Sequence, residues 1–362
     1  MRIAFFTPRS INPLHPRLLH FREFFTDLGI QPDFINRTDY GARSSRINWL
    51  TLWFFDLHAI RQCKPLIKNY DIVFINDLRY LPLAKHARKL NKIVIYDTID
   101  HNVYLRFYQL EQKFRLFRFI KKPITALFSR LEKKYAAYCH EILVNSDSLF
   151  HYFNQHATIL LYTSPFEKLS GQNNPENKIV FLYLGAFTEE KGVAEIIDLQ
   201  RKTNLPLFIF GDVGDTSILH RINNNPTIRY NPKISVMDLK TELGNLLKDY
   251  FLFGFSLIKA AHYSYAVQEA NKDIDYLAMG IPLIGNQRIP TKEKIDAGCG
   301  LLIDDLELIQ KINHVDTRRK LMENCLQYYQ TNYAAIHFNQ KLQTLLTPYL
   351  PKASEKPGSN NP

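Results

Sequence analysis

Residues 271–305 read NKDIDYLAMGIPLIGNQRIPTKEKIDAGCGLLIDD, and this stretch decides the fold. Residues 271–279 carry apolar side chains at helical spacing, and Gly280 follows at a position that favours a helix C-cap. Residues 281–285 are then almost continuously apolar, which is typical of a strand in a parallel sheet that is covered on both faces. A short helix is expected at 292–297. A helix that leads into a buried strand is the repeating unit of an α/β domain.

The start of this helix is a candidate binding site. Asn271 stands where an N-cap residue would stand, and Lys272 and Asp275 share one helix face because they are three residues apart. A helix N-terminus favours anions, and a carboxylate one turn further on can accept hydrogen bonds from ribose hydroxyls. The plainer interpretation is a cap followed by a solvated ion pair. Asp273 and Asp275 also form a D-x-D triplet, but their side chains diverge by roughly 200° on a helix, so we expect no metal site.

The same alternation extends outward from this stretch in both directions. A polar run, EKLSGQNNPENK at 167–178, divides the chain and is typical of a linker. We therefore predict an α/β protein with two Rossmann-like, doubly wound domains facing a cleft, at 1–166 and 179–347. The Pro- and Ser-rich tail, 348–362, is expected to be disordered. Strands are predicted at 2–7, 71–76, 92–97, 141–145, 179–185, 206–211, 227–230, 251–257, 281–285 and 300–303.

The pattern NKxxxYLAMGxPLI, followed by the turn GCGLLI, resembles the donor-binding segment of GT-B glycosyltransferases, especially the family 4-like group (glycosyl transferases group 1). The resemblance implies that the C-terminal domain binds a nucleotide sugar through Asn271, Lys272 and Asp275. The last of these matches the acidic residue that holds the ribose, which is usually Glu in the family. The resemblance also implies that a final helix at about 315–347 crosses back to brace the N-terminal domain.

Two further segments support the resemblance. In YLGAFTEEKGVAEII at 183–197 a strand ends at Gly185, and Lys191 precedes a helix. This is similar to the pattern G-R-x(4–5)-K-G, whose Arg and Lys hold the donor diphosphate, so Lys191 is implied to stabilise charge on the leaving group. The segment LPLFIFGDVGD at 205–215 resembles a strand and loop that line the nucleotide cleft, which implicates Gly211.

The sequence departs from the family pattern at two places. The Arg of the diphosphate motif falls at Ala186, and a second acidic residue that often accompanies the ribose-binding one falls at Val267, with Gln268 and Glu269 beside it. Either another cation replaces the missing Arg, or the activity is altered. The candidates are Lys259, Lys272 and Arg288.

The N-terminal half offers candidate residues for the acceptor and for catalysis. The segment IVIYDTIDHN at 93–102 ends a strand with Asp97, Asp100 and His101, and carboxylates and an imidazole at a strand end can position an acceptor hydroxyl. It resembles the family's V-Y-D-x-H-E strand end, with Asp97 and Asp100 at matching positions. We assign a catalytic role to Lys191, Asp100 and His101, and acceptor binding to Asp97. The first loop, TPRSINPLHPR at 7–17, adds three candidate acceptor-binding cations: Arg9, His15 and Arg17.

The net charge of +11 lies entirely in the N-terminal half. Residues 1–165 hold 24 Lys and Arg against 13 Asp and Glu, whereas residues 166–362 hold 22 of each, which indicates an anionic partner for one half. The segment 103–139 has nine Lys and Arg interleaved with aromatic side chains, which favours an anionic membrane surface. No nucleic-acid-binding motif is present, so we expect no nucleic-acid partner. The bland alternative is an aromatic core with a solvated cationic face.

The sequence therefore predicts a hexosyltransferase that moves a sugar from a UDP- or GDP-sugar to a lipid-linked or other saccharide acceptor in bacterial surface polysaccharide synthesis. By resemblance it would retain anomeric configuration and need neither metal nor cofactor. The four Cys lack metal-type spacing, and no signal peptide or spanning run is evident, so we expect a cytoplasmic protein peripheral to the inner membrane face. The alternatives are a nucleotide-sugar epimerase and a catalytically silent binding subunit. The sequence does not indicate an oligomeric state.

Overall fold

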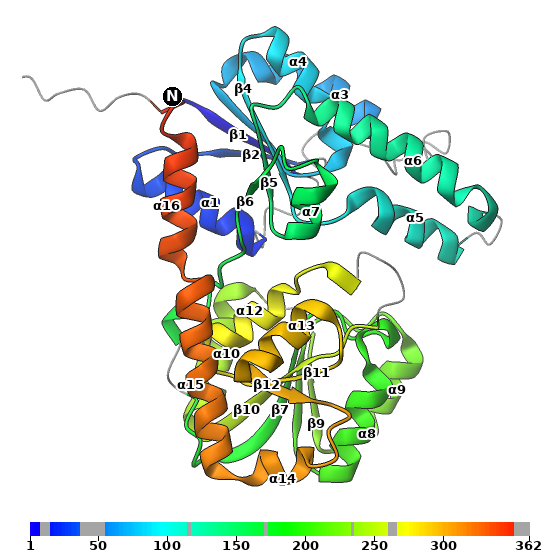
Figure 1. Cartoon of the computed structure of the whole chain (residues 1–362), viewed down its shortest axis with the longest axis vertical. Coiled ribbons are helices and arrows are strands. Elements are labelled where there is room, and N and C mark those ends of the chain that lie inside the picture. Colours follow the sequence, from blue (N-terminus) through cyan, green and yellow to red (C-terminus); the bar gives the residue numbers. More distant parts are fainter. Residues whose placement is uncertain are drawn as a thin grey trace, which may run out of the picture.

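A computed structural model describes residues 1–7, 15–36, 55–113, 117–169, 173–232, 235–259 and 266–350. Figure 1 shows two α/β domains, one above the other. They are joined at one side by the segment that connects them and by the C-terminal helices. Arg9 and the residues after 350 lie outside the described residues. The predicted two-domain, doubly wound α/β architecture is confirmed.

The N-terminal domain is built on a six-stranded parallel sheet of order β2-β1-β3-β4-β5-β6. The sequence predicts four of these strands. It misses β2 and β6 because both are short and half-exposed, so neither has a continuous apolar run. The strands are β1 (Ile3–Thr7), β2 (Asp33–Asn36), β3 (Ile72–Ile75), β4 (Ile93–Thr98), β5 (Glu141–Val144) and β6 (Thr158–Ile159). The α-helices are α1 (Pro16–Asp27), α3 (Leu57–Cys63), α4 (Leu83–Lys89), α5 (Asn102–Lys113), α6 (Phe117–Ala136) and α7 (Asp147–Tyr152).

The C-terminal domain has a second six-stranded parallel sheet, of order β12-β11-β10-β7-β8-β9. The strand order reverses between β7 and β10, and open α/β sheets bind ligands at such a reversal. The strands are β7 (Lys178–Leu184), β8 (Leu207–Phe210), β9 (Ile228–Asn231), β10 (Tyr250–Ser256), β11 (Leu283–Gly285) and β12 (Gly300–Leu302). The α-helices are α8 (Val193–Thr203), α9 (Thr216–Asn223), α10 (Val236–Asp249), α12 (Asn271–Ala278), α13 (Ile289–Lys294), α14 (Leu308–Asn313), α15 (Val315–Asn332) and α16 (Ala335–Leu346).

The helix–strand unit at 271–285 forms as predicted, except that Ala270 and not Asn271 is the N-cap of α12. The unit fixes the position of α12 over the sheet. Tyr276 of α12 is fully buried, and its ring occupies the space where a side chain at Gly254 of β10 would lie. The Tyr276 hydroxyl accepts a hydrogen bond of 2.9 Å from the backbone N–H of Leu184, the last residue of β7. Helix α12 is therefore held beside the carboxyl end of β7.

The connection between the domains lies earlier than predicted. Leu160 packs in the core of the N-terminal domain, whereas Phe166 packs in the core of the C-terminal one. The described parts of the predicted linker, 167–169 and 173–178, belong to the C-terminal domain. Leu169 packs on its core, and Asn173 is fully buried with its amide group bonded to the backbone of Leu252 and Gly280.

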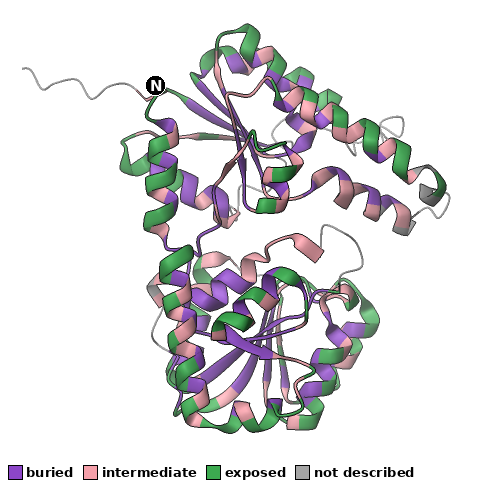
Figure 2. Cartoon of the chain, viewed as in Figure 1, coloured by how far each residue is buried: buried purple, intermediate pink, exposed green. Residues whose placement is uncertain are grey.

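The C-terminal helices return to the N-terminal domain, which confirms the expected bracing. The predicted single helix is two helices, because the chain bends between α15 and α16. Figure 2 shows that one face of α16 is buried. Phe338, on that face, packs 5.5 Å from Phe21 of α1, measured between ring centroids. Tyr349 and Leu350 also pack on this core, so order extends past the predicted end at 347.

Candidate functional site

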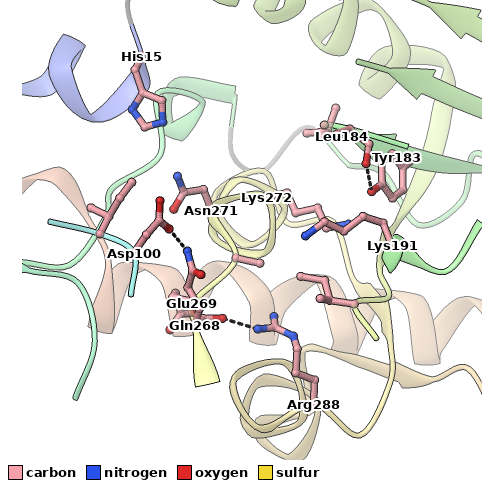
Figure 3. Close-up of a pocket in the computed structure, with 15 residues that line it drawn as sticks. His15, Asp100, Tyr183, Leu184, Lys191, Gln268, Glu269, Asn271, Lys272 and Arg288 are labelled. Atoms are coloured by element: carbon pink, nitrogen blue, oxygen red, sulfur yellow. Dashed lines mark hydrogen bonds between the residues drawn. The ribbon is translucent and has the colours of Figure 1, made fainter. Parts of the chain in front are cut away.

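A cavity of about 320 Å³ lies at the carboxyl end of β7, next to the reversal of strand order in the C-terminal sheet. Both domains contribute to its wall (Figure 3). The N-terminal domain supplies His15, Ile99 and Asp100. The C-terminal domain supplies Tyr183, Leu184, Gly185, Ala186, Lys191, Ile258, Gln268, Glu269, Ala270, Asn271, Lys272 and Arg288.

Glycines shape the wall at the end of β7. Gly185 has a φ of 104°, and a Cβ atom on Gly211 would lie only 2.1 Å from the Gly185 carbonyl oxygen. Only glycine at 211 allows the ends of β7 and β8 to approach in this way. Gly185 lines the cavity, whereas Gly211 packs against the backbone of Gly185 and does not line the cavity. The prediction that Gly211 contacts the ligand is corrected accordingly.

Three cationic side chains converge on the cavity: Lys191, Lys272 and Arg288. Burial, together with the nearby charge of Arg288, lowers the pKa of Lys191. Burial, together with Lys191 and Arg288, lowers the pKa of Lys272 to about 7. Like charges in a poorly solvated site disfavour one another, and a bound anion relieves that cost. The wall is therefore suited to a polyanion such as a diphosphate.

Arg288 is fixed by a buried network. Its Nη2 atom donates to Asp273 Oδ2 at 3.2 Å and to Thr291 Oγ1 at 2.7 Å, and its Nη1 atom donates to the carbonyl of Gln268. Asp273 also accepts hydrogen bonds from Ser256 and Thr291. Because the guanidinium group is oriented by these partners, its position does not depend on a ligand.

Acidic side chains stand opposite the cations. Glu269 lines the cavity and pairs with Lys294, and burial raises the pKa of Glu269. Asp100, from the N-terminal domain, accepts a hydrogen bond from the side chain of Gln268 across the cleft (Figure 3). Asp100 is thus held where it faces both domains, which suits a group that positions an acceptor hydroxyl.

The structure brings together many of the predicted site residues. Lys259, one of three candidates to replace the missing Arg, lies on the surface and pairs with Glu195, whereas the other two candidates line the cavity. Glu269, Gln268 and Tyr183 were not predicted to bind a ligand, although all three lie within or beside the quoted motifs. The predicted residues that line the cavity are Gly185, Lys191, Asn271, Lys272, Asp100 and His15.

Asp275 does not line the cavity, which contradicts its predicted contact with the ribose. Its Oδ1 atom accepts hydrogen bonds from Tyr162 at 3.1 Å and from Ser164 at 2.7 Å. Both donors lie in the segment that connects the domains. Lys272, three residues earlier on α12, reaches the cavity, whereas the Asp275 carboxylate turns toward these two donors. Asp275 therefore ties α12 to the connection between the domains.

Arg17 and Asp97 are also removed from the cavity wall, contrary to their predicted role in acceptor binding. Arg17 makes bonds of 3.0 and 3.1 Å through Nε and of 2.6 Å through Nη2 to the Asp97 carboxylate. Arg17 also donates to the Leu160 carbonyl, and Asn76 donates to Asp97. The two charges therefore neutralise each other inside the domain.

His101 is likewise buried and outside the cavity wall, so the predicted catalytic role is not supported. Its Nε2 atom lies 2.8 Å from the Ser148 hydroxyl, and its ring contacts Tyr104 and Tyr152 edge-on. Burial lowers its pKa to about 4, so the imidazole is neutral at physiological pH. The side chain lies in the core between α5, which carries Tyr104, and α7, which carries Ser148 and Tyr152.

No family model and no curated protein matches the sequence. Several solved structures match over nearly the full length. A trehalose-6-phosphate structure from E. coli bound with UDP-2-fluoro glucose has a TM-score of 0.63 and 11% identity, covering 97% of this chain and 100% of that chain. The α,α-trehalose-phosphate synthase (UDP-forming) of Burkholderia xenovorans, in complex with glucose-6-phosphate, has a TM-score of 0.61 and 8% identity, covering 96% and 100%.

AviGT4, a glycosyltransferase involved in avilamycin A biosynthesis, has a TM-score of 0.55 and 10% identity, covering 96% of this chain and 98% of that chain. At such low identity these likenesses show the fold alone. The chain therefore has the GT-B fold, in which two Rossmann-like domains face each other.

Proposed function

We propose that this protein is a glycosyltransferase that transfers a sugar from a nucleotide-sugar donor to an acceptor hydroxyl. The observation that carries the proposal is the convergence of Lys191, Lys272 and Arg288 on one cavity at the strand-order reversal of a GT-B fold. A UDP- or GDP-sugar carries a diphosphate between nucleoside and sugar, so its negative charge matches this wall.

The side chains around the cavity suggest how transfer would proceed. As the glycosidic bond breaks, negative charge develops on the departing nucleoside diphosphate, and cations fixed around it lower the barrier. Arg288 is already oriented by Asp273 and Thr291, so it needs no rearrangement. We propose that these cations take the role of a metal ion. Asp100 would position the acceptor hydroxyl from the opposite domain.

We further propose a UDP- or GDP-sugar as donor and retention of anomeric configuration. One structural neighbour holds UDP-2-fluoro glucose, and another is described in terms of glycosyl transfer with retention. Those ligands and reactions belong to the neighbours. They support the proposal because the cavity found here lies at the cleft of the same fold.

For the acceptor, we propose a phosphate-bearing, lipid-linked saccharide in bacterial surface polysaccharide synthesis. The excess positive charge of residues 1–165 favours an anionic acceptor on that side of the cleft. Helix α6 presents Phe119, 84% exposed, and Leu127, 53% exposed, beside the exposed cations Lys122, Arg130 and Lys134.

An exposed helix face that mixes apolar and cationic side chains suits the surface of an anionic membrane. We therefore propose that the protein binds peripherally to the cytoplasmic face of the cell membrane through 103–139. None of the helices in the described part of the chain has the length and apolar character that a membrane span requires.

The test is to incubate the protein with UDP-, GDP- and CMP-sugars and an extract of lipid-linked saccharides, and to measure nucleotide release and sugar transfer. The Lys191→Ala variant should lose most transfer. The matched control, Lys259→Ala, should retain it because Lys259 lies outside the cavity. Conversion of the donor to its epimer, or donor binding without any turnover, would contradict the proposal. The first result indicates an epimerase and the second a silent binding subunit.

A further inference from the structure

The Lys272 ammonium group occupies an unusual position at the cavity. Its Nζ atom is buried and has no hydrogen-bond partner within the described ranges. It lies 4.1 Å from the centroid of the Tyr183 ring, which holds it by a cation–π contact. Asp273 is nearby, but its carboxylate is already bonded by Ser256, Thr291 and Arg288. The ammonium thus borders the cavity without an anion of its own.

The groups that face Lys272 come from several elements. Lys191 precedes α8 and Arg288 precedes α13, and both oppose a charge on Lys272, whereas Asp273 on its own helix favours it. Glu269, Asp100 and His15 line the same cavity. A buried ammonium that lacks an acceptor and faces two cations is costly to keep charged.

We propose that Lys272 completes the diphosphate site in place of the arginine that the glycosyltransferase motif has at Ala186, and that Lys272 takes up a proton as the anionic donor binds. This inference rests on the proposed function. The position of Nζ at the cavity supports its role in the diphosphate site. Its burial without a hydrogen-bond partner in the described part of the chain supports the uptake of a proton. The proton comes from water or buffer, whose bond to it breaks as an N–H bond forms at Nζ, and no other covalent bond changes.

The direction of the pH dependence follows from the structure. Without a ligand, burial lowers the pKa of Lys272 to about 7, so about half of the side chains are neutral at that pH. A diphosphate beside Nζ favours the charged form and raises this pKa. Donor affinity is then highest below about pH 7 and falls as the pH rises above it. Arg288 cannot contribute to this effect because guanidinium does not deprotonate in this range.

The experiment is calorimetric titration with UDP-glucose and GDP-glucose at pH 8, in two buffers that differ in ionisation enthalpy. The phosphates of a nucleotide sugar are diesters that do not titrate near this pH, so proton uptake reports on the protein. The wild type should take up close to one proton. Lys272→Arg should still bind the donor and should take up no proton, because its guanidinium group is already charged at this pH. Lys272→Met should bind roughly ten-fold more weakly or worse, since a charged contact is lost.

Lys259→Met is the matched control and should behave as the wild type. Proton uptake that persists in Lys272→Arg would assign it to Lys191, Glu269, Asp100 or His15 and overturn the inference, as would unchanged affinity in Lys272→Met. In either case the proposed function would stand. Failure of wild-type protein to bind either nucleotide sugar, or a CMP-sugar, would overturn both.

Discussion

Arg17 and Asp97 form a buried ion pair in which Arg17 Nη2 lies 2.6 Å from Asp97 Oδ1. The pair joins α1 to the end of β4, and Arg17 continues to the carbonyl of Leu160, where the chain leaves the domain. Two residues that are 80 positions apart therefore hold the N-terminal domain together next to the cleft. Their role is structural, although both are of types that bind phosphates or hydroxyls.

Replacing Arg17 by Met should destabilise the protein by about 3–5 kcal/mol, because Asp97 is left as a buried, unpaired charge. Arg22→Met, on the exposed side of α1, should change stability little. Urea unfolding monitored by circular dichroism measures both. Loss of acceptor use in Arg17→Met without any loss of stability would show that Arg17 acts on the acceptor after all.

Asp275→Asn should become more stable than the wild type as the pH rises. Burial raises the pKa of Asp275 to about 7 from an ordinary value of 3.8, so the folded state holds this proton more tightly than the unfolded state. Its contribution to stability is full below about pH 4 and is lost as the pH rises to about 7. Asn keeps an oxygen that accepts from Tyr162 and Ser164.

The gain of Asp275→Asn in free energy of unfolding should reach at most about 4 kcal/mol above pH 7. Donor affinity should stay within about three-fold of wild type, because Asp275 does not line the cavity. Chemical denaturation at pH 4 and at pH 8, with calorimetry for the donor, tests both statements. A ten-fold loss of donor affinity would indicate that Asp275 does contact the ribose of the donor.

Gly211→Ala should destabilise the protein by at least about 2 kcal/mol and weaken donor binding, because a Cβ atom there collides with the backbone of Gly185 at a positive φ. Gly214→Ala is the matched control in the same loop, where a Cβ atom meets nothing within 4 Å. Thermal unfolding and donor titration of the two variants provide the comparison. Equal behaviour of both variants would contradict the close approach of β7 and β8.

Vesicle flotation should detect binding to anionic lipid but not to neutral lipid. Lys122→Glu together with Arg130→Glu should weaken binding to anionic vesicles more than about ten-fold, since each cation near the surface contributes on the order of 1 kcal/mol. Arg201→Glu with Lys202→Glu, on exposed positions of α8, is the matched control. Equal binding to both kinds of vesicle, or none to either, would remove the membrane proposal.

Much of the fold could be predicted because parallel strands that are covered on both faces appear as short, continuous apolar runs. Residues that follow such strands or begin the next helix could also be placed, as Lys191, Lys272 and Asp100 show. The direction in which each side chain points could not be predicted from the sequence. His101 follows the same strand as Asp100, but it turns into the core.

Partners that are distant in the sequence could not be predicted either. The pairing of Arg17 with Asp97, and the contact of Asp275 with Tyr162, depend on how separate elements pack. Glu269 was passed over because no local pattern distinguishes it from a solvated residue. Its place in the site is evident only from the folded chain, in which Glu269 pairs with Lys294 and lines the cavity.

A crystal structure of the protein with UDP or, if UDP does not bind, GDP tests the proposed donor site most sharply. The diphosphate should lie at the carboxyl end of β7, with its oxygens within hydrogen-bonding distance of Lys191 Nζ, Lys272 Nζ and the Arg288 guanidinium. A diphosphate bound elsewhere, with these three side chains unchanged and without contact to it, would overturn the proposed site.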